Sequence, residues 1–352
     1  MHNAVDIHDI VDRTANILSL SSGGLTHDPD LWFPDGSVVL ESEMIYFKVY
    51  SGILCQASTV FRDMFSFPQP VGDNVEMYDG CPLVHMPDPA RDLKHFLKAL
   101  HDSRYVVKFS IAVQMLTMSC MLSYFDTSEF DLADLPQVVG MLRLGTKYDV
   151  PHLKRRATDV LTRWYPSNFD DFMALPRSML PRDEFPRHAL VANAAREADM
   201  PLILPAALLL CCATIDVKTL WDSGDLHILN RRSLFLGRHL LSHFARTRVQ
   251  SFFFYYQEDR EKEKERDKSE RCQAPERCGS FCRIYASVYD DKEDPWMNPF
   301  YRLNWKSIRS TCCNVCAARW EKHHERATRE LWEELPRIFD LPGWAELKTQ
   351  SH

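Results

Sequence analysis

The sequence predicts an α+β protein that is mostly α-helical. Alternation of apolar and polar residues, which is typical of strands, occurs within residues 38–49, and residues 83–86 are expected to form a short third strand. Apolar residues at helical spacing occupy most of the remaining chain. The length of 352 residues and the hydrophobic content of 45% are sufficient for two or three domains with a sizeable core.

The strand-rich part follows a leader, residues 1–26, that ends in serine and glycine. Alternation in residues 38–40 resumes at residues 46–49, and this pattern predicts a hairpin. Ser58 is suited to cap a helix, because its hydroxyl can accept a backbone N–H of the first turn. The apolar residues that fall at helical spacing around it, and that we expect in an interaction surface or its core, are Ile53, Leu54, Val60, Phe61, Met64 and Phe65.

Further helix starts are marked by capping residues. Asp88 and Pro89 predict a helix with Asp88 as its N-cap and Pro89 at its first position. Another helix is expected from Pro136, and Asn230 is expected to cap a long helix further on. We expect residues 167–255 to be a helical region.

One apolar stretch, residues 105–125, has the length of a membrane span. It contains Lys108 and Gln114, which are costly or unhelpful at the centre of a bilayer. No flank rich in lysine or arginine orients it. We therefore expect a buried helix and no contact with a membrane.

Three motifs resemble the core of a BTB/POZ domain. They are residues 47–54 (FKVYSGIL), 58–65 (STVFRDMF) and 147–153 (KYDVPHL), and the order of hairpin, helix pair, strand, helix and helix pair also matches. Residues 32–36 (WFPDG) and the C-terminal motifs LWEELP and LPGW resemble the expanded BTB family of mushroom-forming fungi. The resemblance covers residues 27–166, within which residues 107–126 are an atypical apolar insertion.

The resemblance implies a non-enzymatic protein–protein interaction module. Its partners would be a second copy of the chain, another BTB protein or a cullin, and the dimer would form through residues 50–65. Such a protein serves as a substrate adaptor of a cullin ubiquitin ligase or as a transcriptional co-regulator. We therefore expect an intracellular location, in the cytoplasm or the nucleus.

The C-terminal part has a distinct composition. Residues 256–271 are a charged linker or helix with both signs mixed, and residues 272–352 are a helical module that carries six of the eleven cysteines. The N-terminus carries several aspartates and no apolar core of a secretory signal, so we expect a reducing compartment. Clustered cysteines in such a compartment indicate metal binding more than disulfides.

Cys313 and Cys316 have the spacing at which two thiolates reach one tetrahedral ion. Cys272 and Cys278 span a loop around Pro275 and are the candidates for the second pair. Four sulfur ligands suit a structural zinc ion, and the sequence suggests no other cofactor. Two alternatives stay open, namely buried thiols without metal and a redox role. The substitute ligands are Cys282, Cys312, His323 and His324.

The net charge of −7 and the short basic runs argue against a nucleic-acid partner. The chain contains neither a phosphate-binding glycine loop nor a hydrolase or metalloprotease motif, so we expect no enzyme. The alternative function is a zinc-stabilised C-terminal module that contacts nucleic acid or protein. One face of its last long helix is expected to be core, with Trp320, His324, Ala327, Leu331 and Leu335.

Overall fold

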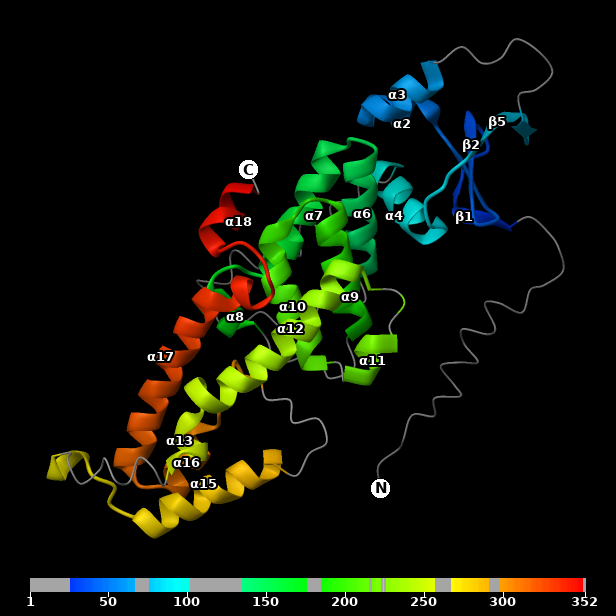
Figure 1. Cartoon of the computed structure of the whole chain (residues 1–352). Helices are drawn as coiled ribbons and strands as arrows, with labels where there is room; N and C mark the ends of the chain where they lie inside the picture. The colour runs from blue at the N-terminus through cyan, green and yellow to red at the C-terminus, as the bar shows by residue number, and fades with distance from the viewer. Residues whose placement is uncertain are drawn as a thin grey trace. The chain divides into compact units, whose positions relative to one another are not determined.

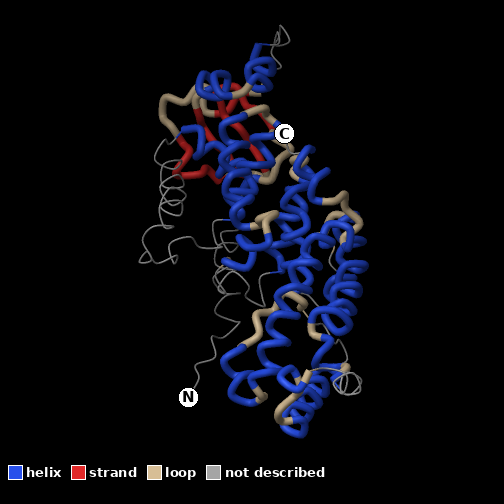
Figure 2. The backbone as a smooth tube through the Cα atoms, turned by 90° about the vertical axis from the view of Figure 1, so that its left-hand side faces the viewer, coloured by secondary structure: helices blue, strands red, loops and turns tan. Residues whose placement is uncertain are grey.

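A computed structural model describes most of the chain as two compact units. The described residues are 26–66, 76–101, 135–175, 185–214, 217–222, 224, 226–256, 267–290 and 298–350. Unit 1 comprises the described residues 26–101 with Lys147–Val150, and unit 2 comprises Leu135–Thr146 and the described residues from Pro151 onward. All described strands belong to unit 1, which also has helices, and the other described elements are helices (Figure 2), which confirms the expected α+β, mostly α fold class.

The sheet of unit 1 has five strands in the order β1-β3-β2-β5-β4. The strands are β1 (Thr26–Trp32), β2 (Val38–Ser42), β3 (Ile45–Val49), β4 (Met77–Tyr78) and β5 (Cys81–His85). β2 and β3 form the predicted antiparallel hairpin, while β1 pairs parallel with β3 and β5 pairs parallel with β2. The hairpin and β5 are confirmed, whereas β1 and β4 were not predicted.

Both faces of the sheet bury side chains. Leu40 and Phe47 are fully buried, and α4 (Ala90–His101) packs against β1 and β2 (Figure 1). A second, smaller cluster contains Val39, Tyr46 and Cys81, with Trp32, Tyr78 and Leu83 packed beside them. The sheet therefore contributes to more than one apolar cluster of unit 1.

Ser58 separates the helices α2 (Ser51–Ala57) and α3 (Thr59–Ser66). The N–H of Phe61 donates to the Ser58 hydroxyl oxygen at 3.0 Å, which confirms Ser58 as the cap of α3. The same hydroxyl donates to the carbonyl oxygen of Tyr148 at 2.5 Å. One buried side chain therefore starts a helix and attaches it to the segment 147–150.

α4 begins at Ala90, one residue after the predicted first position. The N–H of Ala90 donates to the carboxylate of Glu43 in the hairpin turn, at 3.0 Å. The Asp88 carboxylate, which we expected to cap this helix, instead accepts from Lys147 at 2.6 Å and from the Tyr148 hydroxyl. Contacts between residues far apart in sequence therefore replace the predicted capping of α4 by Asp88.

The secondary-structure elements described in unit 2 are all helices. Its elements are α6 (Leu135–Lys147, whose last residue belongs to unit 1), α7 (Pro151–Trp164), α8 (Phe169–Ala174), α9 (Phe185–Glu197), η4 (Pro201–Ile203), α10 (Leu204–Thr214), α11 (Val217–Asp222), α12 (Ile228–Phe244), the π-helical η5 (Ala245–Val249), α13 (Ser251–Phe254), η6 (Lys268–Glu270), α15 (Pro275–Asp290), α16 (Trp305–Thr311), α17 (Asn314–Ile338) and α18 (Trp344–Gln350). α13, α15, α16 and the start of α17 lie together (Figure 1).

α12 does not begin where the sequence suggested. His227 caps it, with its ring nitrogen accepting the N–H of Leu229, and Asn230 lies inside the helix. Asn230 is fully buried, and its side-chain oxygen accepts from Arg196 at 2.5 Å. The capping preference of asparagine is therefore overridden by a buried hydrogen bond, and the predicted cap is wrong.

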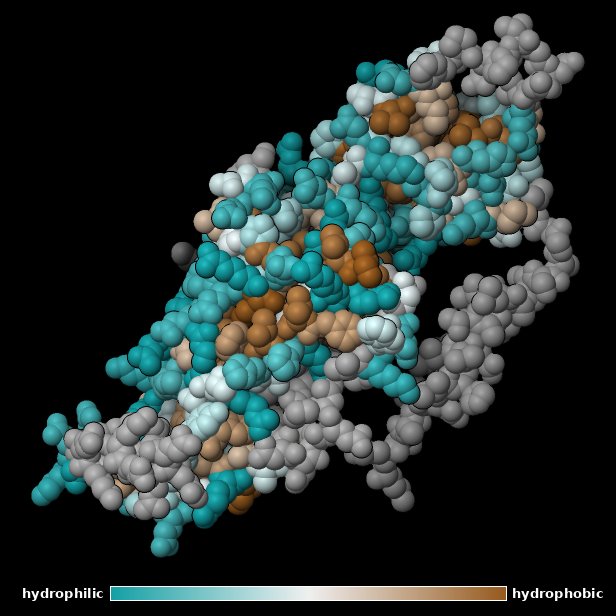
Figure 3. All heavy atoms as spheres, in the orientation of Figure 1, coloured by the Kyte–Doolittle hydropathy of each residue, from teal (hydrophilic) through white to brown (hydrophobic). Residues whose placement is uncertain are grey.

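The expected core face of α17 is confirmed, since Trp320, His324, Ala327, Leu331 and Leu335 are all buried. Other apolar side chains remain at the surface of unit 2. Figure 3 shows brown surface over the middle helices of unit 2. Trp221 of α11 is 71% exposed, and Ile228 at the start of α12 is 66% exposed. Within the described ranges, none of the helices combines the length and apolar character that a membrane span requires. The apolar stretch 105–125 and the insertion 107–126 lie outside those ranges.

Candidate metal centre

The four predicted cysteines come together in unit 2. Cys272 precedes α15, Cys278 lies in its first turn, Cys313 is the N-cap residue of α17 and Cys316 lies in the first turn of α17. Their Sγ atoms all lie within 4.8 Å of one another. Two helix starts that are far apart in sequence, at Pro275 and Asn314, thus supply the two halves of one site.

Backbone N–H groups point at the sulfur atoms. The N–H of Cys313 donates to the Cys278 Sγ at 3.3 Å, and the N–H of Cys316 donates to the Cys313 Sγ at 3.4 Å. A guanidinium N–H of Arg319 lies 3.8 Å from the Cys316 Sγ. Donors at a helix start favour negative charge on a thiol, because they stabilise the thiolate and not the neutral form.

The electrostatics of the four thiols are unequal. Burial alone would raise the pKa of Cys313, but hydrogen bonds from the backbone of Cys316 and Gln273 outweigh it and lower this pKa to about 6. Burial raises the pKa of Cys278 to about 12, and burial also raises the pKa of Cys316. Of these three thiols, Cys313 therefore deprotonates most readily, and deprotonation of Cys278 and Cys316 needs a compensating positive charge.

The spacing of the sulfur atoms fits a tetrahedral ion. A zinc–sulfur bond of about 2.3 Å places tetrahedral thiolates about 3.8 Å apart. The Sγ atoms of Cys272 and Cys313 are 3.8 Å apart, and the limit of 4.8 Å for the group requires only small shifts. None of these cysteines forms a disulfide. The four cysteines are thus a candidate metal site that is compatible with structural zinc.

An aromatic core surrounds the site. Cys278, Cys313 and Cys316 are buried in one cluster with Phe252, Phe253, Tyr256 and Trp320. The Tyr256 hydroxyl donates to the carbonyl oxygen of Pro275 at 3.2 Å and lies 3.5 Å from the Cys272 Sγ. Only Cys272 is partly exposed. This enclosure excludes water from most of the site, as in closed structural centres.

The substitute ligands lie outside the group of four. Cys282 directs its thiol to the carbonyl oxygen of Phe252 at 3.6 Å, and burial raises the pKa of Cys312 to about 11. His323 donates from Nε2 to the carbonyl oxygen of Arg248 at 2.7 Å. His324 is buried beside Trp305, and burial lowers its pKa to about 4. The side chains first chosen from the spacing are therefore the ones that converge.

The residues expected in the interaction region of unit 1 fall into two groups. Leu54 and Phe61 are fully buried and belong to the core. Val60 is 39% exposed, and Ile53, Met64 and Phe65 are half-buried. The helix pair α2–α3 therefore retains apolar surface that is not used in the interior of unit 1.

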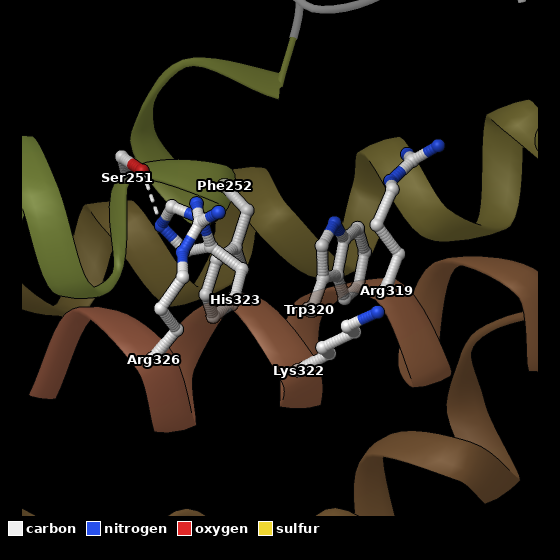
Figure 4. Close-up of a pocket in the computed structure, with 7 residues that line it drawn as sticks. All are labelled: Ser251, Phe252, Arg319, Trp320, Lys322, His323 and Arg326. Atoms are coloured by element: carbon white, nitrogen blue, oxygen red, sulfur yellow. Dashed lines mark hydrogen bonds between the residues drawn. The ribbon is translucent and has the colours of Figure 1, made fainter. Parts of the chain in front are cut away.

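Sequence reasoning missed a pocket of about 350 Å³ between α13 and α17. Ser251, Phe252, Arg319, Trp320, Lys322, His323 and Arg326 line it (Figure 4). The three basic residues and His323 follow the spacing i, i+3, i+4 and i+7 along α17, which places them on one face of the helix. That spacing is readable in the sequence, but the opposing α13 is not.

Comparisons of this chain with protein-family models, with curated proteins and with solved structures find no match.

Proposed function

We propose that this chain is a non-enzymatic interaction protein whose C-terminal part is a binding module stabilised by structural zinc. The observation that carries the proposal is the convergence of the four thiols of Cys272, Cys278, Cys313 and Cys316. Four protein ligands complete the tetrahedral shell and leave no position for a substrate, which is typical of structural and not catalytic zinc. Because zinc-binding cysteines must not be oxidised to disulfides, the proposal implies a reducing compartment, the cytoplasm or the nucleus.

The zinc ion would supply a positive charge that stabilises four thiolates at once. The ion would join the segment from Cys272 to the first turn of α15 to the start of α17 through the cysteine side chains of both. Binding energy of this kind contributes directly to folding stability. The module then presents fixed helix surfaces of α13, α15 and α17 to a partner.

Metal analysis of the purified full-length chain tests this proposal. We expect one zinc ion per chain in the wild type and none in the variant Cys313→Ser/Cys316→Ser. The matched control is Cys211→Ala/Cys212→Ala, which removes two buried thiols of α10 and should retain the zinc. A wild-type chain that purifies without zinc and does not bind added zinc would refute the proposal.

A second interaction function is proposed for unit 1, as a BTB-like platform that self-associates or binds another BTB protein or a cullin. It is supported by the order of hairpin, helix pair, strand and helix, and by the apolar surface of α2–α3 (Figure 3). α2 has no charged residue, so its surface could pack against a second copy without burying an unpaired charge, while α3 adds the exposed Arg62 and Asp63. As an adaptor or a transcriptional co-regulator, the chain would use this surface to recruit its partner.

The mass of the full-length chain in solution tests this second function. We expect a dimer for the wild type and a monomer for Val60→Glu, because the new carboxylate would be desolvated in the interface. Met44→Glu is the control, since Met44 is 66% exposed in the hairpin turn, away from α2–α3. A wild-type monomer that binds neither a BTB protein nor a cullin would exclude this function.

A further inference from the structure

We propose that the pocket between α13 and α17 binds an acidic segment of a partner protein, through carboxylate or phosphoryl side chains. The proposal rests on the proposed function in one respect, since it names the partner chemistry of the zinc-stabilised module. The pocket residues are Ser251 and Phe252 on the α13 side and Arg319, Trp320, Lys322, His323 and Arg326 on α17. All belong to unit 2.

The charge of the pocket is positive, although the chain as a whole carries a net charge of −7. Arg319, Lys322 and Arg326 line it, and no carboxylate is among the lining residues. Arg326 follows Arg319 by seven positions on the helix, which is about 10 Å along the axis. An extended peptide could therefore meet these cations with successive acidic side chains.

The cations differ in how firmly the protein holds them. Arg319 donates to the carbonyl oxygen of Glu270 at 3.3 Å and approaches the Cys316 Sγ at 3.8 Å, so it is anchored to the cysteine cluster. Arg326 pairs with Glu330 only at 3.8 Å, and both side chains are more than half exposed. Such a pair is weak and easily exchanged for a better acceptor.

Lys322 is the most available of these cations. It is exposed, and it makes no ion pair among the residues that the structure describes. A lysine ammonium has three donors that rotate freely, so it adapts to a carboxylate or a phosphoryl group. Figure 4 shows Arg326 and His323 near Ser251 and Phe252, with Arg319 at the other end beyond Trp320.

The floor of the pocket favours a peptide over a nucleic acid. Trp320 and Phe252 stack on each other with ring centroids 5.5 Å apart, and both are buried. Their faces are therefore not available to stack with bases, which single-stranded nucleic acids use for much of their binding energy. His323 and Ser251 already donate to the carbonyl oxygen of Arg248. The accessible donors are thus the basic groups at the rim.

A binding experiment with the zinc-replete full-length chain tests the proposal. The probe is a fluorescein-labelled oligoglutamate peptide, followed by anisotropy at about 0.15 M salt, where distant charges are largely screened. A phosphoserine peptide and an oligothymidylate of equal net charge are the other arms. The variant Lys322→Ala/Arg326→Ala should weaken peptide binding about tenfold or more, because two charge-assisted contacts are lost.

The matched control is Lys306→Ala/Lys348→Ala, which removes the same charge from exposed positions of α16 and α18. This control should bind the peptides within about twofold of the wild type, as expected for surface charges outside the contact. Preference for the phosphoserine or the glutamate peptide identifies the source of the anionic group. Equal losses in both variants, absence of peptide binding, or tighter binding of the oligothymidylate would overturn the proposal.

Metal content measured on the same samples separates the two proposals. Zinc without pocket-dependent peptide binding refutes the acidic-peptide site and leaves the zinc-stabilised module. Pocket-dependent peptide binding by a chain that holds no zinc supports the acidic-peptide site and refutes the zinc proposal.

Discussion

Two groups of cysteines in unit 2, one fully buried and one mostly buried, differ in the contacts that their thiols make. Cys211 and Cys212 are fully buried within the Ala/Leu-rich α10, where burial raises the pKa of Cys212 to about 12. Adjacent positions on a helix do not face each other, so this pair cannot readily share one ion. In the cluster of four, by contrast, two helix starts converge and backbone N–H groups donate to sulfur. Burial alone keeps thiols inert, whereas convergence of four thiols with backbone donors makes them candidate ligands.

Among the predicted changes in stability, the largest is expected on removal of the metal. A zinc chelator is expected to lower the unfolding temperature of the wild type by about 10 °C or more, because structural zinc contributes several kcal/mol to folding. Calorimetry with and without chelator measures the change. The variant Cys211→Ala/Cys212→Ala should show the same chelator-induced drop, whereas Cys313→Ser/Cys316→Ser should show none. If the chelator left the unfolding temperature of the wild type unchanged, the cluster of four cysteines would not differ from Cys211 and Cys212 in metal binding.

The next effect concerns His324, a substitute ligand on the buried face of α17. Its folded pKa of about 4 lies below the usual 6.5, so the folded state resists protonation. Its contribution to stability is complete above pH 6.5 and declines as the pH falls toward 4, by up to about 3 kcal/mol. Its Nε2 has no hydrogen-bond partner in the described structure, so His324→Leu should fold.

Denaturant unfolding of wild type and His324→Leu at pH 7 and at pH 5 measures this effect. The variant should lose less stability than the wild type between these values, and it should retain zinc at pH 7. The acid sensitivity of the cysteine cluster is common to both proteins and cancels in the difference. Loss of zinc in His324→Leu would show that the imidazole is a ligand.

Packing of α12 provides a contribution that is independent of the metal. A Cβ added at Gly237 would lie 2.2 Å from Cε1 of Phe339, so the aromatic ring would have to move. We expect Gly237→Ala to cost about 2 kcal/mol, as overpacking of a dense core usually does. Urea unfolding should give the same cost with and without chelator, since distant sites are additive.

Gly52→Ala is the control for that substitution. A Cβ at Gly52 meets nothing within 4 Å, and the residue lies in α2. This change should be neutral or should stabilise unit 1 by up to about 1 kcal/mol, from helix propensity alone. A chelator-dependent cost of Gly237→Ala would indicate that the cysteine cluster and α12 are coupled.

The smallest effect is expected in unit 1, at Ser58. Ser58→Ala removes the cap of α3 and the hydrogen bond to the carbonyl oxygen of Tyr148, at a cost of about 1–2 kcal/mol. The control is Ser66→Ala at the exposed end of α3, which should lower the free energy of unfolding by no more than about 0.5 kcal/mol. The Ser58→Ala cost should not change on addition of chelator, because the cysteine cluster belongs to unit 2.

Local signals in the sequence were sufficient for part of the fold. Alternation identified the hairpin, and the hydroxyl of Ser58 identified a helix cap, because both depend on neighbours in sequence. β1 was missed because Asp28, Pro29 and Asp30 disfavour strands and only its pairing with β3 defines it. Asn230 was assigned as a cap on the same local preference, which its buried contact with Arg196 overrides.

The candidate metal site, like the fold, was predictable in part from local signals. Cys313 and Cys316 form a ligand pair by spacing alone, since one helix start positions both. Cys272 and Cys278 were chosen over Cys282 and Cys312 because they span a loop around Pro275. Only the packing of α15 against α16 and α17 decides which thiols converge. The basic pocket could not be predicted, because it depends on α13 lying against α17.

X-ray absorption at the zinc edge of the full-length chain tests the central claim most directly. The account predicts a first shell of four sulfur atoms at about 2.3 Å, with no nitrogen or oxygen ligand. A first shell that contains nitrogen or oxygen would contradict the assignment of Cys272, Cys278, Cys313 and Cys316 as the complete ligand set.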